Sequence, residues 1–160
     1  MSRDKESKKK YGIRRLFNKI LQALAKSSLF SGYMRARIQK IRGVKIDNPN
    51  SVFIGEDVIF DAISPENITI KNGVEIAAGT KIISHFPDTT TLSTHKDYHY
   101  RFYQGKVVIE EDVFIGFNCV IAKPVTIGRG SVLGANTVIT KNIPPNSVIV
   151  QPESIYIKKE

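Results

Sequence analysis

Six aliphatic residues recur at intervals of six in the second half of this chain, and this spacing constrains the fold more than any other feature. These anchors are Ile109, Ile115, Ile121, Ile127, Leu133 and Ile139. An α-helix repeats about every 3.6 residues and a flat strand every two, so neither produces this period. The spacing is typical of a solenoid, in which each repeat forms one side of a coil.

Each anchor is followed four places later by a small or β-branched residue or a close substitute, and three anchors are followed directly by glycine. The residues four places on are Val113, Cys119, Val125, Ser131, Thr137 and Ile143. The glycines are Gly116, Gly128 and Gly134. Three six-residue sides would make a triangular coil, and successive coils would stack as parallel strands about 4.8 Å apart. The alternative, an antiparallel sandwich, would show period-two alternation and a turn signal about every 8–12 residues. We therefore predict an all-β solenoid.

The same spacing occurs upstream and is interrupted twice. Ile70, Ile76 and Ile82 follow it, and a looser copy begins at Ile54. The count slips between Phe60 and Ile70, where Pro65 indicates a bulging corner. Residues 86–106 contain no hexad and are rich in polar and aromatic residues, so we predict an excursion loop there. Long loops in compact domains are often functional.

The length of 160 residues suits one domain with a sizeable core. We divide it into a basic amphipathic helical segment (1–45), a repeat domain (46–150) and a C-terminal tail (151–160). The net charge of +9 is unevenly distributed, since residues 1–45 carry +12 and the remainder carries −3. No aromatic stacking platform or groove-reading motif accompanies the basic residues, which argues against nucleic acid as a partner.

The basic segment contains a helical pattern of apolar residues. They are spaced as on one helix face: Ile13, Leu16, Phe17, Ile20, Leu21 and Leu24. A second helix is predicted over 33–41, with Gly43 as its C-cap. We expect the apolar face of the first helix to dock on the open end of the first coil. The basic residues around it, such as Arg14 and Arg15, could also attract an anionic membrane surface.

No apolar run approaches the ~20 residues that span a bilayer, and no signal peptide is evident. The single cysteine, Cys119, falls on an inward small position and is expected to be core filler. We expect a cytoplasmic protein, in which the basic leader would allow peripheral contact at the inner membrane face.

Two stretches resemble a known family. The run G-K-V-V-I-E-E-D-V-F-I-G-F-N-C-V-I and the closing G-A-N-T-V-I-T-K-N-I-P-P-N-S-V are similar to the hexapeptide-repeat acyltransferases, whose fold is a left-handed parallel β-helix. The nearest branch is that of the maltose, galactoside and surface-polysaccharide O-acetyltransferases. The resemblance covers about residues 43–150. It implies a homotrimer, acetyl-coenzyme A as donor, and an active site in the groove between subunits, and we expect no resident metal.

The resemblance also implies a histidine just before the excursion loop, and His85 matches it in I-A-A-G-T-K-I-I-S-H-F. A general base with a pKa near working pH can remove the proton of a sugar hydroxyl as it attacks a thioester. Attack produces a tetrahedral oxyanion, which a backbone N–H can stabilise. The family motif places that N–H at Gly116 or Phe117. The alternative for His85 is a histidine that only anchors the loop.

Other polar residues are candidates for contact with the acceptor. Asp61 matches a position where sugar acetyltransferases have a polar residue, and it could orient His85, bind a sugar hydroxyl or be a solvated turn residue. Asp88 is a weaker candidate for orienting the histidine, and Tyr98 is a candidate for contact with a sugar ring. His95 and His99 also lie in the loop. Related β-helices of the gamma carbonic anhydrase type hold zinc with three histidines, but both loop histidines lack the placement on stacked coils that those ligands need.

For the donor, the resemblance implies contacts from the backbone along the coils and from a lysine near the phosphates. The residues are Gly116, Phe117, Gly134, Ala135, Thr140 and Lys141. Relatives commonly continue with Gly-Asn-Pro-Ala after the paired prolines, whereas this chain has V-Q-P-E at 150–153, which alters the seat expected for the adenine end.

Two hypotheses follow. The first is an enzyme that transfers acetyl from acetyl-coenzyme A to a saccharide hydroxyl, the expected acceptor being a precursor of a surface polysaccharide. The second is a non-catalytic β-helix that scaffolds or binds a partner.

Overall fold

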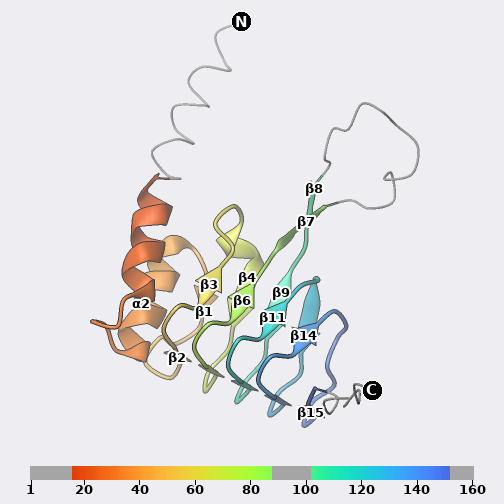
Figure 1. Ribbon diagram of the computed structural model, residues 1–160. Coiled ribbons are helices and arrows are strands. Elements are labelled where there is room, and N and C mark those ends of the chain that lie inside the picture. Colours follow the sequence, from red (N-terminus) through yellow and green to blue (C-terminus); the bar gives the residue numbers. More distant parts are fainter. Residues whose placement is uncertain (1–15, 88–101, 152–160) are drawn as a thin grey trace, which may run out of the picture.

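The computed structural model describes residues 16–87 and 102–151. Apart from the pair β7 and β8 described below, its strands form three parallel sheets, which the chain visits in turn as it passes through successive coils (Figure 1). The first sheet contains β1 (Lys45–Ile46), β4 (Ile68–Ile70), β9 (Val107–Ile109) and β12 (Val125–Ile127). The second contains β2 (Phe53–Ile54), β5 (Glu75–Ile76), β10 (Phe114–Ile115), β13 (Val132–Leu133) and β15 (Val148–Ile149). The third contains β3 (Ile59–Phe60), β6 (Lys81–Ile82), β11 (Val120–Ile121) and β14 (Val138–Ile139). This arrangement fits a left-handed parallel β-helix.

The anchors form columns through the core, as the six-residue period predicts. Ile76, Ile115 and Leu133 lie in register on neighbouring strands of the second sheet, and each is fully buried. The strands of each inner coil are hydrogen-bonded to strands of the neighbouring coils. These bonds stabilise strands of only two or three residues. The predicted small positions before Ile143 are buried too, including Val113, Cys119 and Ser131.

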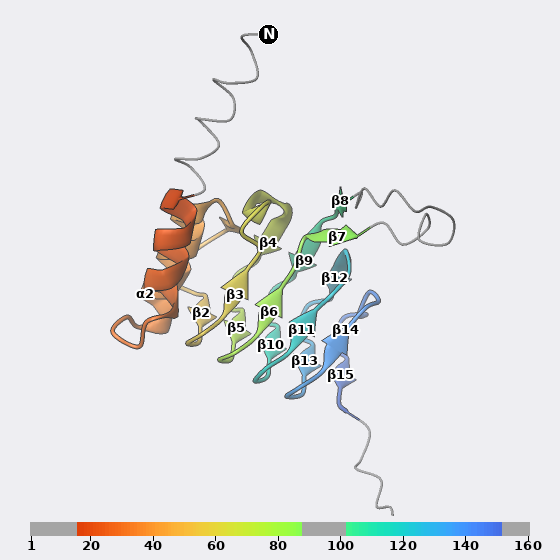
Figure 2. The same ribbon diagram turned by 45° about the horizontal axis from the view of Figure 1, so that its top comes forward.

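The last hexad departs from the predicted register. Ile143, expected on a small position, pairs with the anchor Ile127 through an isolated bridge, and its backbone carbonyl accepts from Gly128 N–H at 2.8 Å. The turn from Ile139 to Ile143 is therefore two residues shorter than a full hexad. The chain then continues into β15, at the opposite end of the stack from the helices (Figure 2).

Both interruptions lie at the corner between the third and first sheets. The first holds a short 3₁₀ helix, η1 (Pro65–Asn67), where Pro65 predicts a bulge. At the second, β7 (His85–Pro87) pairs antiparallel with β8 (Phe102–Gln104). The excursion therefore begins and ends as a two-stranded ribbon, although the sequence predicts no regular structure in 86–106. Phe86 is buried against the ring of Tyr103, with ring centroids 5.5 Å apart.

Two helices cover the first coil. Helix α2 (Gly32–Arg42) packs on β2, its N-cap Ser31 accepts from Met34 N–H, and it ends at Gly43, whose φ of 113° is left-handed. Gly43 is thus the C-cap that the sequence predicts. The described part of the preceding helix spans 16–26.

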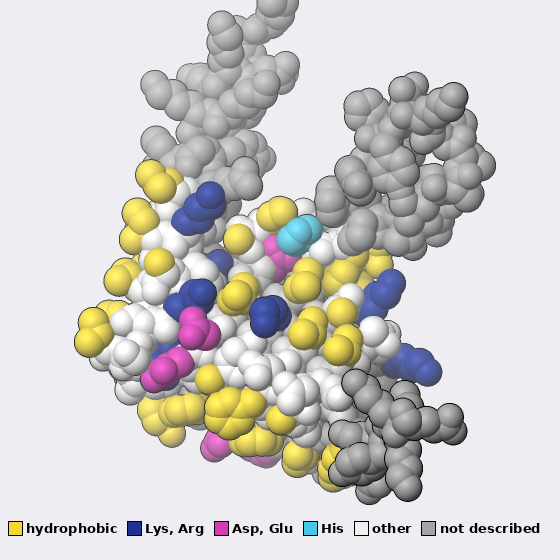
Figure 3. Space-filling view, viewed as in Figure 1, with side chains coloured by type: hydrophobic (Ala, Val, Ile, Leu, Met, Phe, Trp, Pro, Cys, Tyr) yellow, Lys and Arg dark blue, Asp and Glu magenta, His cyan; other side chains and the backbone are white. Residues whose placement is uncertain are grey.

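The expected docking of the first helix through its apolar face is wrong. Asn18 and Ala25 are buried, whereas Leu16 and Phe17 are 60% and 51% exposed. The helix packs through its polar side because polar groups there form hydrogen bonds with the rest of the protein, as Gln22 does with Val58. Figure 3 shows hydrophobic side chains along its outer surface. Within the described residues, no helix has the length and hydropathy needed to cross a membrane.

Candidate active site

His85 and Asp61 meet at the corner between the third and first sheets. Asp61 follows β3 in the first coil, and His85 begins β7 three residues after the end of the matching strand β6 in the second coil. Because the coils are in register, the two side chains lie one above the other although 24 residues separate them. The Nδ1 atom of His85 is 2.6 Å from Oδ2 of Asp61. The stack thus forms a histidine–carboxylate pair from two adjacent coils.

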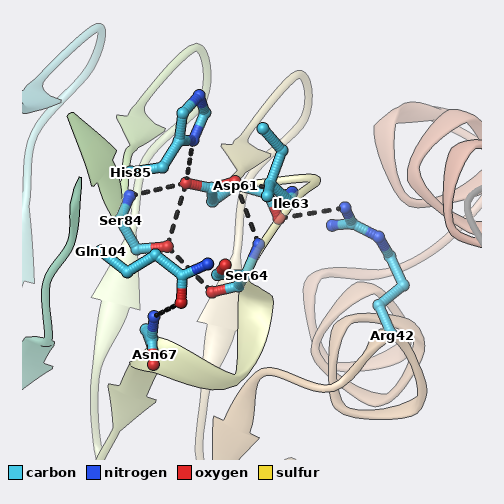
Figure 4. A network of polar contacts seen from close by, with 8 residues as sticks. All are labelled: Arg42, Asp61, Ile63, Ser64, Asn67, Ser84, His85 and Gln104. Carbon is cyan, nitrogen blue, oxygen red and sulfur yellow. Dashed lines mark hydrogen bonds and ion pairs between the residues drawn. The ribbon is translucent and has the colours of Figure 1, made fainter. Parts of the chain in front are cut away.

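The carboxylate of Asp61 is buried and surrounded by donors (Figure 4). Its Oδ1 accepts from the backbone N–H of Ile63 at 2.7 Å, and its Oδ2 accepts from the backbone N–H of Ser84 at 2.8 Å. The Ser84 hydroxyl lies 3.0 Å from Oδ2 and 2.8 Å from the carbonyl oxygen of Ser64. Burial alone raises the pKa of Asp61, but the hydrogen bonds from His85, Ile63 and Ser84 outweigh it and lower the pKa to about 2. Asp61 is therefore ionised at neutral pH.

The ionised carboxylate determines the tautomer of His85. A carboxylate can only accept a hydrogen bond, so the Nδ1 atom of His85 is the protonated nitrogen. In neutral imidazole the lone pair then lies on Nε2, and the ring nitrogen that points away from Asp61 in Figure 4 is this atom. The His85 side chain is 30% exposed, whereas that of Asp61 is fully buried. This arrangement is suited to accepting a proton from a group bound at the surface.

Arg42, at the end of α2, supports the same corner. It is buried, and its Nη2 donates to the backbone carbonyl oxygen of Asp61 at 3.5 Å. Its Nε donates to the carbonyl oxygen of Asn18 at 3.2 Å, and its Nη1 donates to the side-chain oxygens of Gln22 and Gln39. Burial lowers the pKa of Arg42 to about 10, opposed by the charge of Asp61. The guanidinium therefore remains charged at neutral pH and ties both helices to the corner of the pair.

Of the three roles considered for Asp61, its position favours orientation of His85. The buried carboxylate has no surface for a sugar hydroxyl and is not a solvated turn residue. Asp88, Tyr98, His95 and His99 lie outside the described residues. Among the residues that the structure does describe, no group of three or more His, Cys, Asp or Glu side chains could hold a metal ion.

The predicted donor-binding residues fall on two different corners. Gly116, Phe117, Gly134 and Ala135 lie between the second and third sheets, on successive coils. There the coils are closely stacked, since a Cβ added to Gly116 would lie 2.7 Å from Ala135 N. Thr140 and Lys141 are exposed at the corner that also holds His85. One protomer therefore does not bring all six residues together.

Hydrogen bonding distinguishes the two candidate oxyanion donors. The N–H of Gly116 donates to the carbonyl oxygen of Leu133 at 2.8 Å, so it is already used in the sheet. The N–H of Phe117 makes no hydrogen bond within the described part of the chain, while the Phe117 carbonyl accepts from Asn136 N–H at 2.7 Å. Phe117 is therefore the better candidate. The N–H of Gly134 is likewise used, donating to Ile149 O at 2.7 Å.

Comparison with known families agrees with the stacked coils. The family described as bacterial transferase hexapeptide (six repeats) matches residues 106–141. These residues are similar to the hexapeptide repeats of bacterial transferases. The match confirms the resemblance over the coils formed by β9 to β14. Cys119 lies within this hexapeptide-repeat segment and is buried, with its Sγ 3.2 Å from the carbonyl oxygen of Gly134, as expected of core filler.

Solved structures share the fold. A hexapeptide-repeat acetyltransferase from Vibrio cholerae O1 biovar eltor, in complex with acetyl coenzyme A, has a TM-score of 0.61 and 24% identity, covering 87% of this chain and 82% of that one. A maltose O-acetyltransferase from Clostridium difficile 630 has a TM-score of 0.53 and 23% identity, covering 84% of this chain and 80% of that one. At these identities the likeness establishes the fold and not the substrate.

Sequence relatives match only in part. The bifunctional protein GlmU of Dechloromonas aromatica (strain RCB) is 54% identical over 43 residues, which are 27% of this chain and 10% of that protein. This chain thus spans about a tenth of the length of that relative.

The sequence did not reveal two parts of the site. Ser84 donates to Asp61 because it precedes His85 at the same corner. In the sequence, only its position next to the histidine could have suggested that it belongs to the site. From the sequence pattern, Arg42 is only the residue after the end of a predicted helix, with no indication of a role in the site. Its role depends on contacts with Asn18 and Asp61, which no local pattern records.

Proposed function

We propose that this protein is an O-acetyltransferase, which transfers an acetyl group from acetyl-coenzyme A to a hydroxyl of a saccharide, with His85 as general base. The observation that supports this most directly is the 2.6 Å contact between His85 Nδ1 and the buried carboxylate of Asp61. The hexapeptide-repeat segment and the acetyltransferases that share the fold support acyl transfer as the reaction class.

In this mechanism, Nε2 of His85 takes the proton of the acceptor hydroxyl while the hydroxyl oxygen attacks the thioester carbon. The C–O bond forms as the carbonyl π electrons move onto oxygen, and collapse of the tetrahedral intermediate expels the coenzyme A thiolate. The imidazolium can then return its proton to that thiolate. Asp61 stabilises the imidazolium, and its low pKa keeps it ionised throughout. No covalent intermediate with the protein is needed.

The separation between the candidate oxyanion donor, Phe117 N–H, and His85 supports a site shared between protomers. Phe117 and His85 lie on corners separated by the third sheet, a span on the order of 10 Å or more at about 3.3 Å per strand residue. A single N–H to oxyanion contact needs about 3 Å. We therefore include a homotrimer in the proposal, in which Phe117 of one protomer faces His85 of the next.

The donor would extend along the coils beside Gly116, Phe117, Gly134 and Ala135, with Thr140 and Lys141 near its phosphates. The ammonium of Lys141 is suited to neutralising a pyrophosphate, and this side chain is exposed. The exposed Lys141 supports this placement, whereas the N–H groups of Gly116 and Gly134 are already hydrogen-bonded within the sheet, so contacts there would use other backbone atoms. Asp88 and Tyr98 stay candidates for acceptor contact.

We further propose a precursor of a surface polysaccharide as the acceptor. A lipid-linked precursor would agree with the basic N-terminal segment, which carries +12 over residues 1–45. In that case the enzyme would work in peripheral contact with the inner membrane face.

The test is the His85→Ala variant, assayed for release of free coenzyme A from acetyl-coenzyme A with a panel of saccharides. We expect kcat to fall by roughly 10²–10⁴-fold, the usual contribution of a general base. The Arg129→Ala variant provides the control, because Arg129 is exposed at the corner between the first and second sheets, which holds no residue of the proposed site. Turnover unchanged by His85→Ala would contradict the role of His85 as general base, whereas no turnover by the wild type with any saccharide would favour a non-catalytic β-helix that scaffolds or binds a partner.

A further inference from the structure

The helix over 16–26 is amphipathic but is mounted with its apolar face outward. Leu16 is 60% exposed, Phe17 and Ile20 are each 51% exposed, and Leu24 is 43% exposed. These four residues follow the spacing i, i+1, i+4, i+8, so they share one side of the helix. In Figure 3 hydrophobic side chains follow the outer surface of this helix, away from the coils.

The orientation is held by contacts on the opposite side. Ala25 is 1% exposed and Asn18 is 8% exposed against the rest of the protein. The side-chain amide of Gln22 donates to the carbonyl oxygen of Val58 at 3.0 Å, and Lys26 pairs with Asp57 at 3.5 Å. Arg42 adds its hydrogen bond to the Asn18 carbonyl. Because the polar face is satisfied by the protein, rotating the helix to bury its apolar face would break all of these contacts.

We propose that this outward face, formed by Leu16, Phe17, Ile20 and Leu24, is a docking surface for an anionic lipid bilayer. A helix that presents Leu, Ile and Phe on one face beside basic residues can bury that face at the headgroup boundary. Lys19 is exposed on the same helix, and the sequence places Arg14 and Arg15 just before it. Basic residues close to an anionic leaflet are attracted to it by its negative surface potential.

The distribution of charge favours lipid over a second copy of this chain. Residues 1–45 carry +12, whereas the rest of the chain carries −3. A symmetric contact between two copies through this face would bring two strongly basic segments together, which is unfavourable. An anionic bilayer supplies both the opposite charge and the apolar phase that the face requires.

Docking in this way would also place the candidate site near the bilayer. The helix covers the first coil, and Arg42 connects Asn18 of this helix to the backbone of Asp61. The proposal does not depend on acyl transfer, since it concerns the helix surface alone. It can therefore fail or succeed independently of the proposed enzyme activity.

Vesicle binding by the full chain, without substrates, tests the proposal. We expect sedimentation with vesicles of phosphatidylcholine and phosphatidylglycerol (about 70:30), weaker binding to phosphatidylcholine alone, and a loss of at least about tenfold in affinity for Phe17→Asp/Ile20→Asp. The charge-matched control is Val148→Asp/Val150→Asp, at residues 69% and 71% exposed at the opposite end of the stack. This control should bind as the wild type does.

Three results would overturn the proposal: no binding of the wild-type chain to anionic vesicles, equal binding of both double variants, or loss of the oligomer in the helix variant without loss of vesicle binding. The last would assign the face to a subunit contact, and light scattering measures it. Should the aspartate variant not fold by circular dichroism, Phe17→Ser/Ile20→Ser makes the same comparison with the same expected loss.

Discussion

Arg42 donates a hydrogen bond to the backbone carbonyl of Asp61, so the end of α2 supports the corner that holds the histidine–carboxylate pair. The same guanidinium binds the carbonyl of Asn18 and the side chains of Gln22 and Gln39. A single buried side chain therefore joins two helices to the first coil. This contact connects the stability of the N-terminal segment with the geometry of the site.

Replacement of Arg42 should destabilise the fold. In Arg42→Met the acceptors at Asn18, Gln22 and Asp61 lose their donor while buried or half-buried. Leaving such groups without partners costs about 1–3 kcal/mol, and leaving the buried Asp61 carboxylate without the nearby guanidinium charge can cost more. We expect the free energy of unfolding in urea to fall by about 2–4 kcal/mol.

The matched control is Arg37→Met, which removes an exposed guanidinium bound to Asn50. It should lower the free energy of unfolding by less than about 1 kcal/mol. Equal losses in the two variants would contradict the role assigned to Arg42.

Substitution of Asp61 should impair turnover more than folding at neutral pH. The Asp61→Asn variant keeps the shape of the side chain, but the new amide is neutral and cannot stabilise an imidazolium as a carboxylate does. We expect kcat with acetyl-coenzyme A to fall by about 10²-fold or more. The measurement is steady-state release of coenzyme A as a function of pH. A variant with the wild-type kcat and pH profile would show that Asp61 has no part in orienting His85.

The stability of the protein should depend on acid pH through Asp61. The folded-state pKa is about 2 and the reference value is 3.8, so ionised Asp61 stabilises the native state. That contribution, on the order of 2 kcal/mol, is fully present above pH ~4 and is lost as the pH falls toward ~2. Urea unfolding between these values should show the difference between wild type and Asp61→Asn shrinking as pH falls. A constant difference across this range would rule out the lowered pKa.

Close stacking at the corner between the second and third sheets can be tested with two glycines. A Cβ at Gly116 would lie 2.7 Å from Ala135 N and 2.8 Å from Leu133 O, which is inside van der Waals contact with backbone that cannot rotate away. We expect Gly116→Ala to lower the free energy of unfolding by about 1–3 kcal/mol. At Gly134 the nearest atom, Ile149 O, is 3.1 Å away, so Gly134→Ala should cost clearly less. Thermal unfolding of both variants shows which one is less stable. If Gly134→Ala were the less stable variant, the coils would be spaced differently from this structure.

Sequence reasoning worked where the physical cause is local or periodic. The anchors from Ile109 to Ile139 are buried because a coil of fixed length returns every sixth side chain to the interior. Gly43 ends α2 because a left-handed φ favours glycine. Both conclusions use only spacing or backbone preference. His85 was identified from the family resemblance together with the break in the hexad count beside it, and its role as general base stays a proposal.

Sequence reasoning failed where the outcome depends on distant partners. Ile143 lies on an anchor column because the shortened corner before it, and not the count of six, determines its register with Ile127. The outward apolar face of the first helix could not be foreseen, because Val58 is 36 residues from Gln22 and Arg42 is 24 residues from Asn18.

By itself, the sequence determined the coil, since an aliphatic residue at every sixth position can be buried only by a chain that turns with that period. Only the tertiary structure decided that Asp61 is buried against His85 and that the first helix turns its apolar face outward. Both outcomes depend on hydrogen-bond donors and acceptors that stacking brings together from separate coils and helices. These hydrogen bonds offset the free-energy cost of burying charged and polar groups. The donor and acceptor of each come from separate stretches of the chain.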